Sequence, residues 1–277
     1  MNSSSIVLKF GTGVLATPGG CAIEHKQIRR IAGEIAAIMK QGISCIMVSS
    51  GAIAAGVHTL ELDARPADQA GKQACAAVGQ PALMAAYAKY FSRHGITTAQ
   101  LLLTHEDIYT EQRRHNAQAT LRRLLASPHV LPIINENDSV AVEELKLGDN
   151  DELSAEVAIM IKARLLILVT SSDGLRAKTK KSSKRIPLVS DLAEVLHHVT
   201  QEKGEHSTGG MTTKLQAVAA ATAAGIETVI VHGRKPKQIT KALAGNDVGT
   251  RFLSNSTQDK EENGHKEHKE IKERAFF

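Results

Sequence analysis

Two lysines, Lys9 and Lys214, lie far apart in the sequence, and each stands beside residues that suit contact with a phosphate group. Lys9 is followed by Gly11 and Gly13, and glycine lets the backbone approach a phosphate closely. Lys214 comes one turn into an alanine-rich helical pattern that opens with Thr-Gly-Gly, where an anion would meet the helix N-terminus. We therefore predict that both lysines handle one phosphate group.

Each lysine segment also has a plain structural interpretation. The first could be a strand-end lysine before a tight turn, and the second a threonine-capped helix with a solvent-facing lysine. Neither segment matches a familiar nucleotide motif, because Ala16 breaks the GxGxxG pattern and no Walker A loop is present. Taken singly, the two segments leave both interpretations open.

Three further segments place polar side chains where elements are expected to meet. Ser49, Ser50 and Gly51 directly follow an apolar run, so their hydroxyl and backbone donors could hold a carboxylate or simply cap a helix. The segment Asn135–Asp138 and the run Asp149-Asn150-Asp151 supply carboxylates and amides. Phosphoryl transfer needs such groups to orient lysines, metal ion and acceptor, although Asp149 and Asp151 could also cap a helix.

The elements that must position these residues alternate between short aliphatic runs and helical patterns, which indicates an α/β fold. We predict a three-layer αβα sandwich with a mainly parallel central sheet. Its strands are nearly continuous in apolar character, as buried parallel strands are. The predicted strands are Ser5–Phe10, Ser44–Val48, Thr98–Leu103, Val130–Ile134, Leu165–Val169 and Thr228–Val231.

Helices are predicted between these strands from apolar residues at helical spacing, such as Ile28, Ile31, Ile35 and Ile38. The other predicted helices are Gln69–Arg93 with an interruption near Gly79-Gln80-Pro81, Asn116–Ala126, Asp191–Thr200, Asp151–Ala163, Met211–Ala224 and Pro236–Ala244. A hairpin is expected over 139–148. We expect one catalytic domain over 1–255 and a charged, disordered tail over 256–277.

Composition excludes several classes of protein. The net charge is +5, but Trp is absent and aromatic residues make up only 3%, so stacking platforms for nucleic acid are not available in quantity. The lysine-rich stretch from Lys178 to Arg185 is interpreted as a solvated loop, with a nucleotide-facing role as the alternative. Three widely spaced cysteines indicate free thiols in a reducing, cytoplasmic setting. We expect neither export nor membrane anchoring, and no residue is assigned as a metal ligand.

Taken in order along the chain, these segments resemble the members of the amino-acid kinase family that phosphorylate free glutamate. The resemblance covers roughly residues 5–255 and rests on KFGTGVL, VSSGAIAAG, KQACAAVGQ, LLLT, the stretch Asn116–Leu121, NENDSV, GDNDELSA and STGGMTTK. It implies ATP-dependent phosphorylation of the γ-carboxylate of L-glutamate to L-glutamyl 5-phosphate, the first step of proline biosynthesis. ATP and Mg²⁺ are the implied cofactors.

By this resemblance, Lys9 and Lys214 flank the moving phosphoryl group and Asp151 orients them. The acceptor carboxylate is already ionised at neutral pH, so the proposed in-line attack needs no general base. The implied nucleotide-binding residues are Lys9, Thr170, Ser171, Thr208, Gly209, Gly210, Met211, Thr212, Thr213 and Lys214. Ser171 departs from the family, which has an aspartate there, and this alters the adenine-side loop.

On the substrate side, the resemblance implies that Ser50, Asp138 and Asn150 bind glutamate, with Lys146 as a weaker candidate. The region near Glu143 corresponds to the family's site for glutamate and inhibitory proline, so feedback inhibition is a hypothesis. A homo-oligomer, dimer or tetramer, is expected, with no nucleic acid and no membrane as partner. The alternatives are a relative acting on N-acetylglutamate, carbamate or a phosphate monoester, a catalytically dead amino-acid sensor, and an RNA-binding protein.

Overall fold

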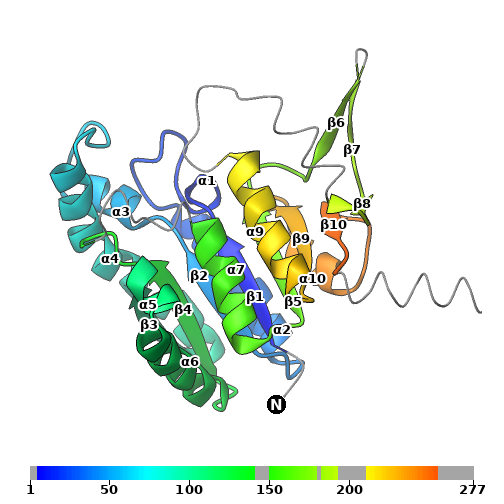
Figure 1. The fold of residues 1–277 in the computed structure, drawn as a ribbon. Coiled ribbons are helices and arrows are strands. Elements are labelled where there is room, and N and C mark those ends of the chain that lie inside the picture. The colour runs from blue at the N-terminus through cyan, green and yellow to red at the C-terminus, as the bar shows by residue number, and fades with distance from the viewer. Residues whose placement is uncertain (1–4, 141–149, 180–181, 193–209, 255–277) are drawn as a thin grey trace, which may run out of the picture.

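The computed structural model describes residues 5–140, 150–179, 182–192 and 210–254, which form one large sheet covered by helices on both faces (Figure 1). The sheet has eight strands in the order β3-β4-β2-β1-β5-β9-β10-β8, and every pair is parallel except β9 with β10. The strands are β1 (Ile6–Phe10), β2 (Cys45–Ser49), β3 (Thr97–Leu103), β4 (Val130–Glu136), β5 (Leu165–Thr170), β8 (Leu188–Val189), β9 (Glu227–His232) and β10 (Thr250–Phe252). The predicted α/β class is confirmed.

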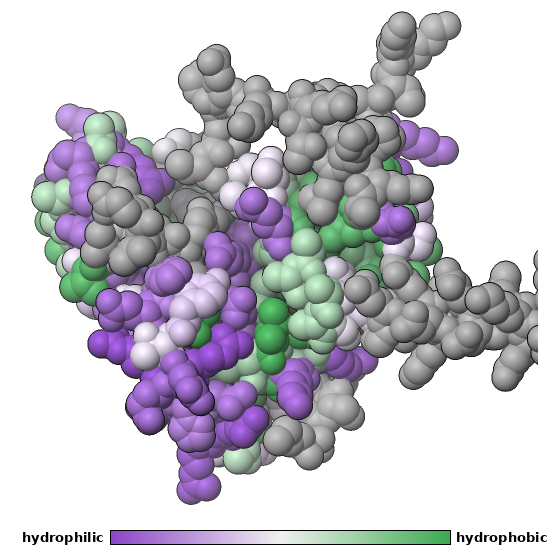
Figure 2. Space-filling view, in the orientation of Figure 1, coloured by the Kyte–Doolittle hydropathy of each residue, from purple (hydrophilic) through white to green (hydrophobic). Residues whose placement is uncertain are grey.

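The helices divide into two layers, one on each face of the sheet. One layer holds α1 (Thr12–Leu15), α2 (His25–Met39), α3 (Ala52–Thr59), α4 (Gln69–Phe91) and α10 (Gln238–Leu243), with the 3-10 turn η1 (Ser92–His94) after α4. The other holds α5 (His105–Tyr109), α6 (Glu111–Leu125), α7 (Asn150–Ile161) and α9 (Met211–Ala223). Figure 2 shows mainly hydrophilic residues over α6, as an amphipathic helix in an outer layer requires.

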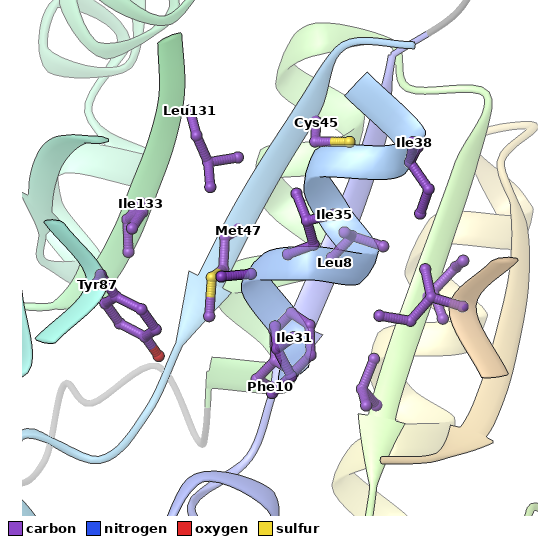
Figure 3. Packing of buried hydrophobic residues seen from close by; sticks show 14 of the residues in the cluster. Leu8, Phe10, Ile31, Ile35, Ile38, Cys45, Met47, Tyr87, Leu131 and Ile133 are labelled. Carbon is purple, nitrogen blue, oxygen red and sulfur yellow. The ribbon is translucent and has the colours of Figure 1, made fainter. Parts of the chain in front are cut away.

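The side chains of β1 point alternately to the two faces of the sheet, so they pack against different helix layers. Leu8 and Phe10 pack in the cluster under α2, where Ile31 and Ile35 lie against them (Figure 3). Val7 packs in the opposite cluster, under α7 and α9. Since successive strand residues point to opposite faces, Lys9 shares the face of Val7. Its charged end is thereby directed toward α7 and α9.

The predicted interruption of α4 near Gly79-Gln80-Pro81 is wrong, because the helix runs through Pro81 without a break. Close packing of α4 on α3 explains this difference. A Cβ on Gly79 would lie 1.9 Å from the carbonyl oxygen of Ala52, and one on Gly56 would lie 1.9 Å from that of Cys75. The two glycines therefore let the helix backbones touch, and this tertiary contact outweighs the local cost of proline.

Several elements differ from the predicted set in other ways. The antiparallel hairpin of β6 (Arg176–Thr179) and β7 (Ser182–Arg185) was not predicted, and neither were the short strands β10 and β8 that follow β9 in the sheet. Three expected elements lie wholly or mostly outside the described residues: the hairpin over 139–148 except its first two residues, most of the helix at Asp191–Thr200, and the tail over 256–277. The division into domain and tail stays a prediction.

All three cysteines are free, and burial raises the pKa of the Cys45 thiol to about 12.

None of the described helices is long and apolar enough to cross a membrane.

We expect Gly79→Ala to lower the free energy of unfolding by about 1–3 kcal/mol, because its methyl group would overlap the Ala52 carbonyl and push α3 from α4. Urea denaturation followed by circular dichroism measures this change. The matched control is Gly33→Ala in α2, where the nearest side-chain atom to a new Cβ is 4.0 Å away, so the helix should be unchanged or gain up to about 1 kcal/mol. Equal effects of the two variants would contradict the packing argument.

Candidate active site

Three charged side chains meet at the carboxyl end of β1. The Nζ of Lys9 lies 2.6 Å from one carboxylate oxygen of Asp151, and the Nζ of Lys214 lies 3.0 Å from the other. Asp151 has no exposed surface, Lys9 is 3% exposed and Lys214 is 9% exposed. The two lysines singled out from the sequence are thus neighbours, and one carboxylate separates their charges.

The topology explains why these residues meet. Lys9 is the next-to-last residue of the central strand β1, on the face covered by α7 and α9, and these two helices pack against each other. Asp151 is in the first turn of α7, and Lys214 is one turn inside α9. Two buried ammonium groups around one carboxylate suit contact with an anion such as a phosphate group.

The substrate side of the site is built from the ends of β2 and β4 and the first residue of α7. The Nδ2 of Asn150 donates to the Oγ of Ser50 at 2.9 Å and to the Oδ1 of Asn135 at 2.9 Å. Ser50 precedes Gly51, whose φ of 109° lies in the left-handed region that favours glycine. Ser50 and Asn150, predicted from separate segments, are therefore in direct contact.

Tyr87 of α4 stabilises the Ser49–Gly51 turn through a hydrogen bond with Ser49. Its hydroxyl lies 2.7 Å from the Oγ of Ser49, which itself donates to the carbonyl of Ser50 at 2.9 Å. Because Ser49 uses its proton on that carbonyl, Tyr87 must donate to Ser49. Burial raises the pKa of Tyr87 well above its usual value, although the hydrogen bond with Ser49 opposes the shift, so the phenol stays protonated.

A cavity of about 540 Å³ lies between α4, one face of β3 and the carboxyl end of β4. Asp138 lines this cavity together with Glu136 and Asn137, and Gln80 and Gln100 line it from α4 and β3. Asp138 is therefore placed at the cavity rather than in the lysine cluster. Of the other substrate-side residues named from the sequence, Lys146 lies outside the described residues.

The residues predicted to contact the nucleotide lie at the carboxyl end of β5 and at the amino end of α9. Thr170 ends β5, and Ser171 follows it at the surface, close enough to Gly13 that a Cβ there would lie 3.7 Å from the Ser171 Oγ. In α9, Met211, Thr212 and Thr213 precede Lys214, and the Thr213 hydroxyl donates to the carbonyl of Gly210 at 2.9 Å. Thr208 and Gly209 lie outside the described residues.

The loop after Ser171 contains the carboxylate of Asp173, which forms an ion pair with Arg176. The Nη2 of Arg176 lies 3.0 and 2.9 Å from the two carboxylate oxygens of Asp173. Desolvation acts to raise the pKa of Asp173, yet the hydrogen bonds and charge of Arg176 outweigh it and hold that pKa below its ordinary value. Asp173 thus remains ionised in its pair with Arg176.

Arg234, directly after β9, is a residue that the sequence interpretation missed. Its guanidinium donates to the carbonyls of Gly13 at 3.2 Å and Ala16 at 2.6 Å and pairs with Glu24 at 2.7 Å. It therefore ties the glycine segment after Lys9 to the end of β9. The signal that could have found it is an arginine directly after a glycine at the end of a buried parallel strand.

Asn135 also contacts the site, although no role was predicted for it individually. Its Oδ1 accepts from Asn150, and the side chain is 1% exposed. The available signal was its place at the head of the Asn-Glu-Asn-Asp segment, which had been singled out as a whole.

Within the described ranges, no group of three or more His, Cys, Asp or Glu residues is arranged to hold a metal ion. Each oxygen of Asp151 faces a lysine, so this carboxylate is engaged with cations of the protein. Magnesium commonly binds through phosphates of the substrate, and a magnesium–nucleotide complex needs no cage of protein ligands. The site suits such a complex as substrate.

Comparisons with known proteins agree on the family. Residues 4–258 match the model of the amino acid kinase family. The chain is 43% identical to a glutamate 5-kinase of Trichlorobacter lovleyi over 252 residues, covering 90% of this chain and 66% of that protein. It is 42% identical to a glutamate 5-kinase of Thermus thermophilus over 255 residues, covering 91% and 68%.

The chain thus spans about two thirds of the length of the curated relatives it matches. Among solved structures, a UMP kinase from Bacillus anthracis superposes with a TM-score of 0.61 at 15% identity, covering 91% of this chain and 96% of that one. At that identity the likeness shows the fold alone. The strand order, the match over nearly the whole described chain and the identities above establish that this chain belongs to the amino acid kinase family.

Proposed function

We propose that this chain transfers the γ-phosphoryl group of ATP to the γ-carboxylate of L-glutamate and forms L-glutamyl 5-phosphate, the first step of proline biosynthesis. The observation that carries the proposal is the buried cluster of Lys9, Asp151 and Lys214 next to the contact between Ser50 and Asn150. The glutamate 5-kinase relatives, at 42% and 43% identity, support glutamate as the acceptor.

Catalysis in this proposal comes from position and charge. The two lysines stabilise the negative charge that spreads over the phosphoryl oxygens during in-line transfer, and Asp151 sets the spacing between them. The attacking γ-carboxylate is ionised at neutral pH, so no residue has to remove a proton. Magnesium, bound to the nucleotide phosphates, would neutralise further charge.

The remaining site residues divide between nucleotide and acceptor. Lys9, Thr170 and Ser171 would contact the nucleotide from one side, and the segment Thr208–Lys214 from the other. Ser50, Asp138 and Asn150 would bind glutamate. These assignments are supported by the sheet topology, because the adjacent parallel strands β4, β2, β1 and β5 all end on the same side of the sheet.

Regulation and assembly are part of the same proposal. Inhibition by L-proline would act near Glu143 and Glu144, which lie outside the described residues. A homo-oligomer is also proposed, since β3 leaves one edge of the sheet unpaired among the described strands.

We expect the purified chain to release ADP with glutamate, and hydroxylamine to trap the product as an acyl hydroxamate. Lys214→Met should lower kcat at least about 100-fold, because a cation at the transferred phosphoryl group is lost. The control is Lys241→Met, which removes an exposed lysine from α10 and should leave kcat unchanged. An equal or larger signal with N-acetylglutamate would overturn the choice of acceptor, and full turnover in Lys214→Met would overturn the mechanism.

We expect Asp151→Asn to lower both kcat and stability, because the carboxylate that contacts both buried ammonium groups would lose its charge. The loss in the free energy of unfolding should be about 3 kcal/mol by urea denaturation, and kcat should fall at least about 100-fold. Glu111→Gln, an exposed acidic residue in the first turn of α6, is the control and should stay within about 0.5 kcal/mol. A stable and active Asp151→Asn variant would contradict the assigned role of the carboxylate.

We expect Ser171→Asp to change the KM for MgATP at least about threefold and to leave the KM for glutamate unaltered. The reason is that Ser171 lies at the surface beside Gly13, so a new carboxylate there would face the nucleotide side only. Steady-state kinetics with each substrate varied in turn measure the split, and Ser172→Asp is the neighbouring control. A change confined to the KM for glutamate would remove Ser171 from the nucleotide side.

A further inference from the structure

Four side-chain amides form a continuous chain of hydrogen bonds behind the substrate side of the site. The Nδ2 of Asn150 donates to Asn135 at 2.9 Å, the Nδ2 of Asn135 donates to Gln80 at 3.0 Å, and the Nε2 of Gln80 donates to Gln100 at 2.9 Å. The chain crosses from α7 through β4 and α4 to β3. Asn135, Gln80 and Asn150 are 1%, 8% and 8% exposed, and only Gln100 reaches the surface.

The polarity of this chain is set by the backbone. The N–H of Glu136 points at the Oδ1 of Asn135 at 2.9 Å and at the Oδ1 of Asn150 at 3.4 Å. A backbone N–H can only donate, so each asparagine must turn its oxygen toward Glu136. Asn135 then presents its NH₂ group to Gln80, and Gln80 in turn presents its NH₂ group to Gln100.

The orientation of Asn150 decides what Ser50 can offer a ligand. Asn150 donates to the Oγ of Ser50, so that oxygen acts as an acceptor toward the protein and its proton stays available for a carboxylate. If the amide of Asn150 were reversed, Ser50 would donate into the protein and turn its lone pairs toward the ligand. A carboxylate would then meet repulsion instead of a hydrogen bond.

We propose that Gln80, with Gln100 behind it, is a positioning residue for the acceptor site. By accepting from the Nδ2 of Asn135, it acts together with the N–H of Glu136 to hold Asn135, and through it Asn150, in the orientation that directs the Ser50 proton toward the acceptor carboxylate. This inference rests on the proposed function, since it takes glutamate as the acceptor. It assigns to α4 and β3 a role in acceptor affinity, although neither element carries a residue of the lysine cluster.

The test is Gln80→Met, which keeps side-chain length and helix preference but removes both hydrogen bonds. We expect the KM for glutamate to rise about five- to tenfold, with kcat and the KM for MgATP within about twofold. Gln100→Leu, at the exposed end where water can replace the amide, should raise the KM for glutamate only about twofold. Gln112→Met on α6 is the matched control and should change nothing.

A second readout does not depend on turnover. The side-chain NH₂ signals of Asn150 in a ¹⁵N-edited NMR spectrum, assigned by their loss in Asn150→Asp, should shift in Gln80→Met and stay in place in Gln112→Met. If they stay in place in Gln80→Met, or if kcat and both KM values change together, the inference is wrong. If they shift while the wild-type chain fails to phosphorylate glutamate, the amide chain stands and the proposed function falls.

Discussion

The site depends on one carboxylate that keeps two buried ammonium groups together. Burying three charges is costly, and an apolar trio of the same volume would pack at least as well, so stability alone does not account for the cluster. Its geometry is what matters: Asp151 holds Lys9 and Lys214 on opposite oxygens, at 2.6 and 3.0 Å. The central position of β1, the packing of α7 on α9 and the exclusion of water all serve to hold this arrangement.

The two sides of the site are held by different physical means. On the side that we propose for the nucleotide, charged groups and backbone carbonyls dominate, as in the contacts of Arg234 with Gly13 and Ala16. On the side that we propose for the acceptor, neutral amides and hydroxyls dominate, linked by Asn135 and Asn150. Neutral groups with fixed polarity can discriminate a ligand by its donors and acceptors, whereas the charged groups mainly stabilise the phosphoryl transfer itself.

Much of the fold could be predicted because it follows from local patterns. Apolar runs located all six strands of the parallel part of the sheet, and the alternation along β1 separates Lys9 from Leu8 and Phe10. The lysines, Asp151, Ser50 and Asn150 could be singled out because they follow strands or open helices. These signals lie within a few residues of each position.

What could not be predicted depends on contacts between distant segments. Gly79 and Pro81 look like a helix break until α3 is packed against them. Gln80 reaches Asn135 only because α4 lies beside β4, 55 positions along the chain. The short strands β8 and β10 have too few residues to show the alternation of a strand. Arg234 gains its partners from α1 and α2, more than 200 positions away.

Asn150 and Asp151 are consecutive residues in the first turn of α7, yet one belongs to the acceptor side and the other to the phosphoryl side. Neighbours in an α-helix are separated by a rise of about 1.5 Å and a rotation of about 100°. The spacing between these two side chains is therefore set by helix geometry, whereas their contacts with Ser50, Lys9 and Lys214 depend on the packing of separate segments. Any displacement of α7 as a rigid helix moves Asn150 and Asp151 together.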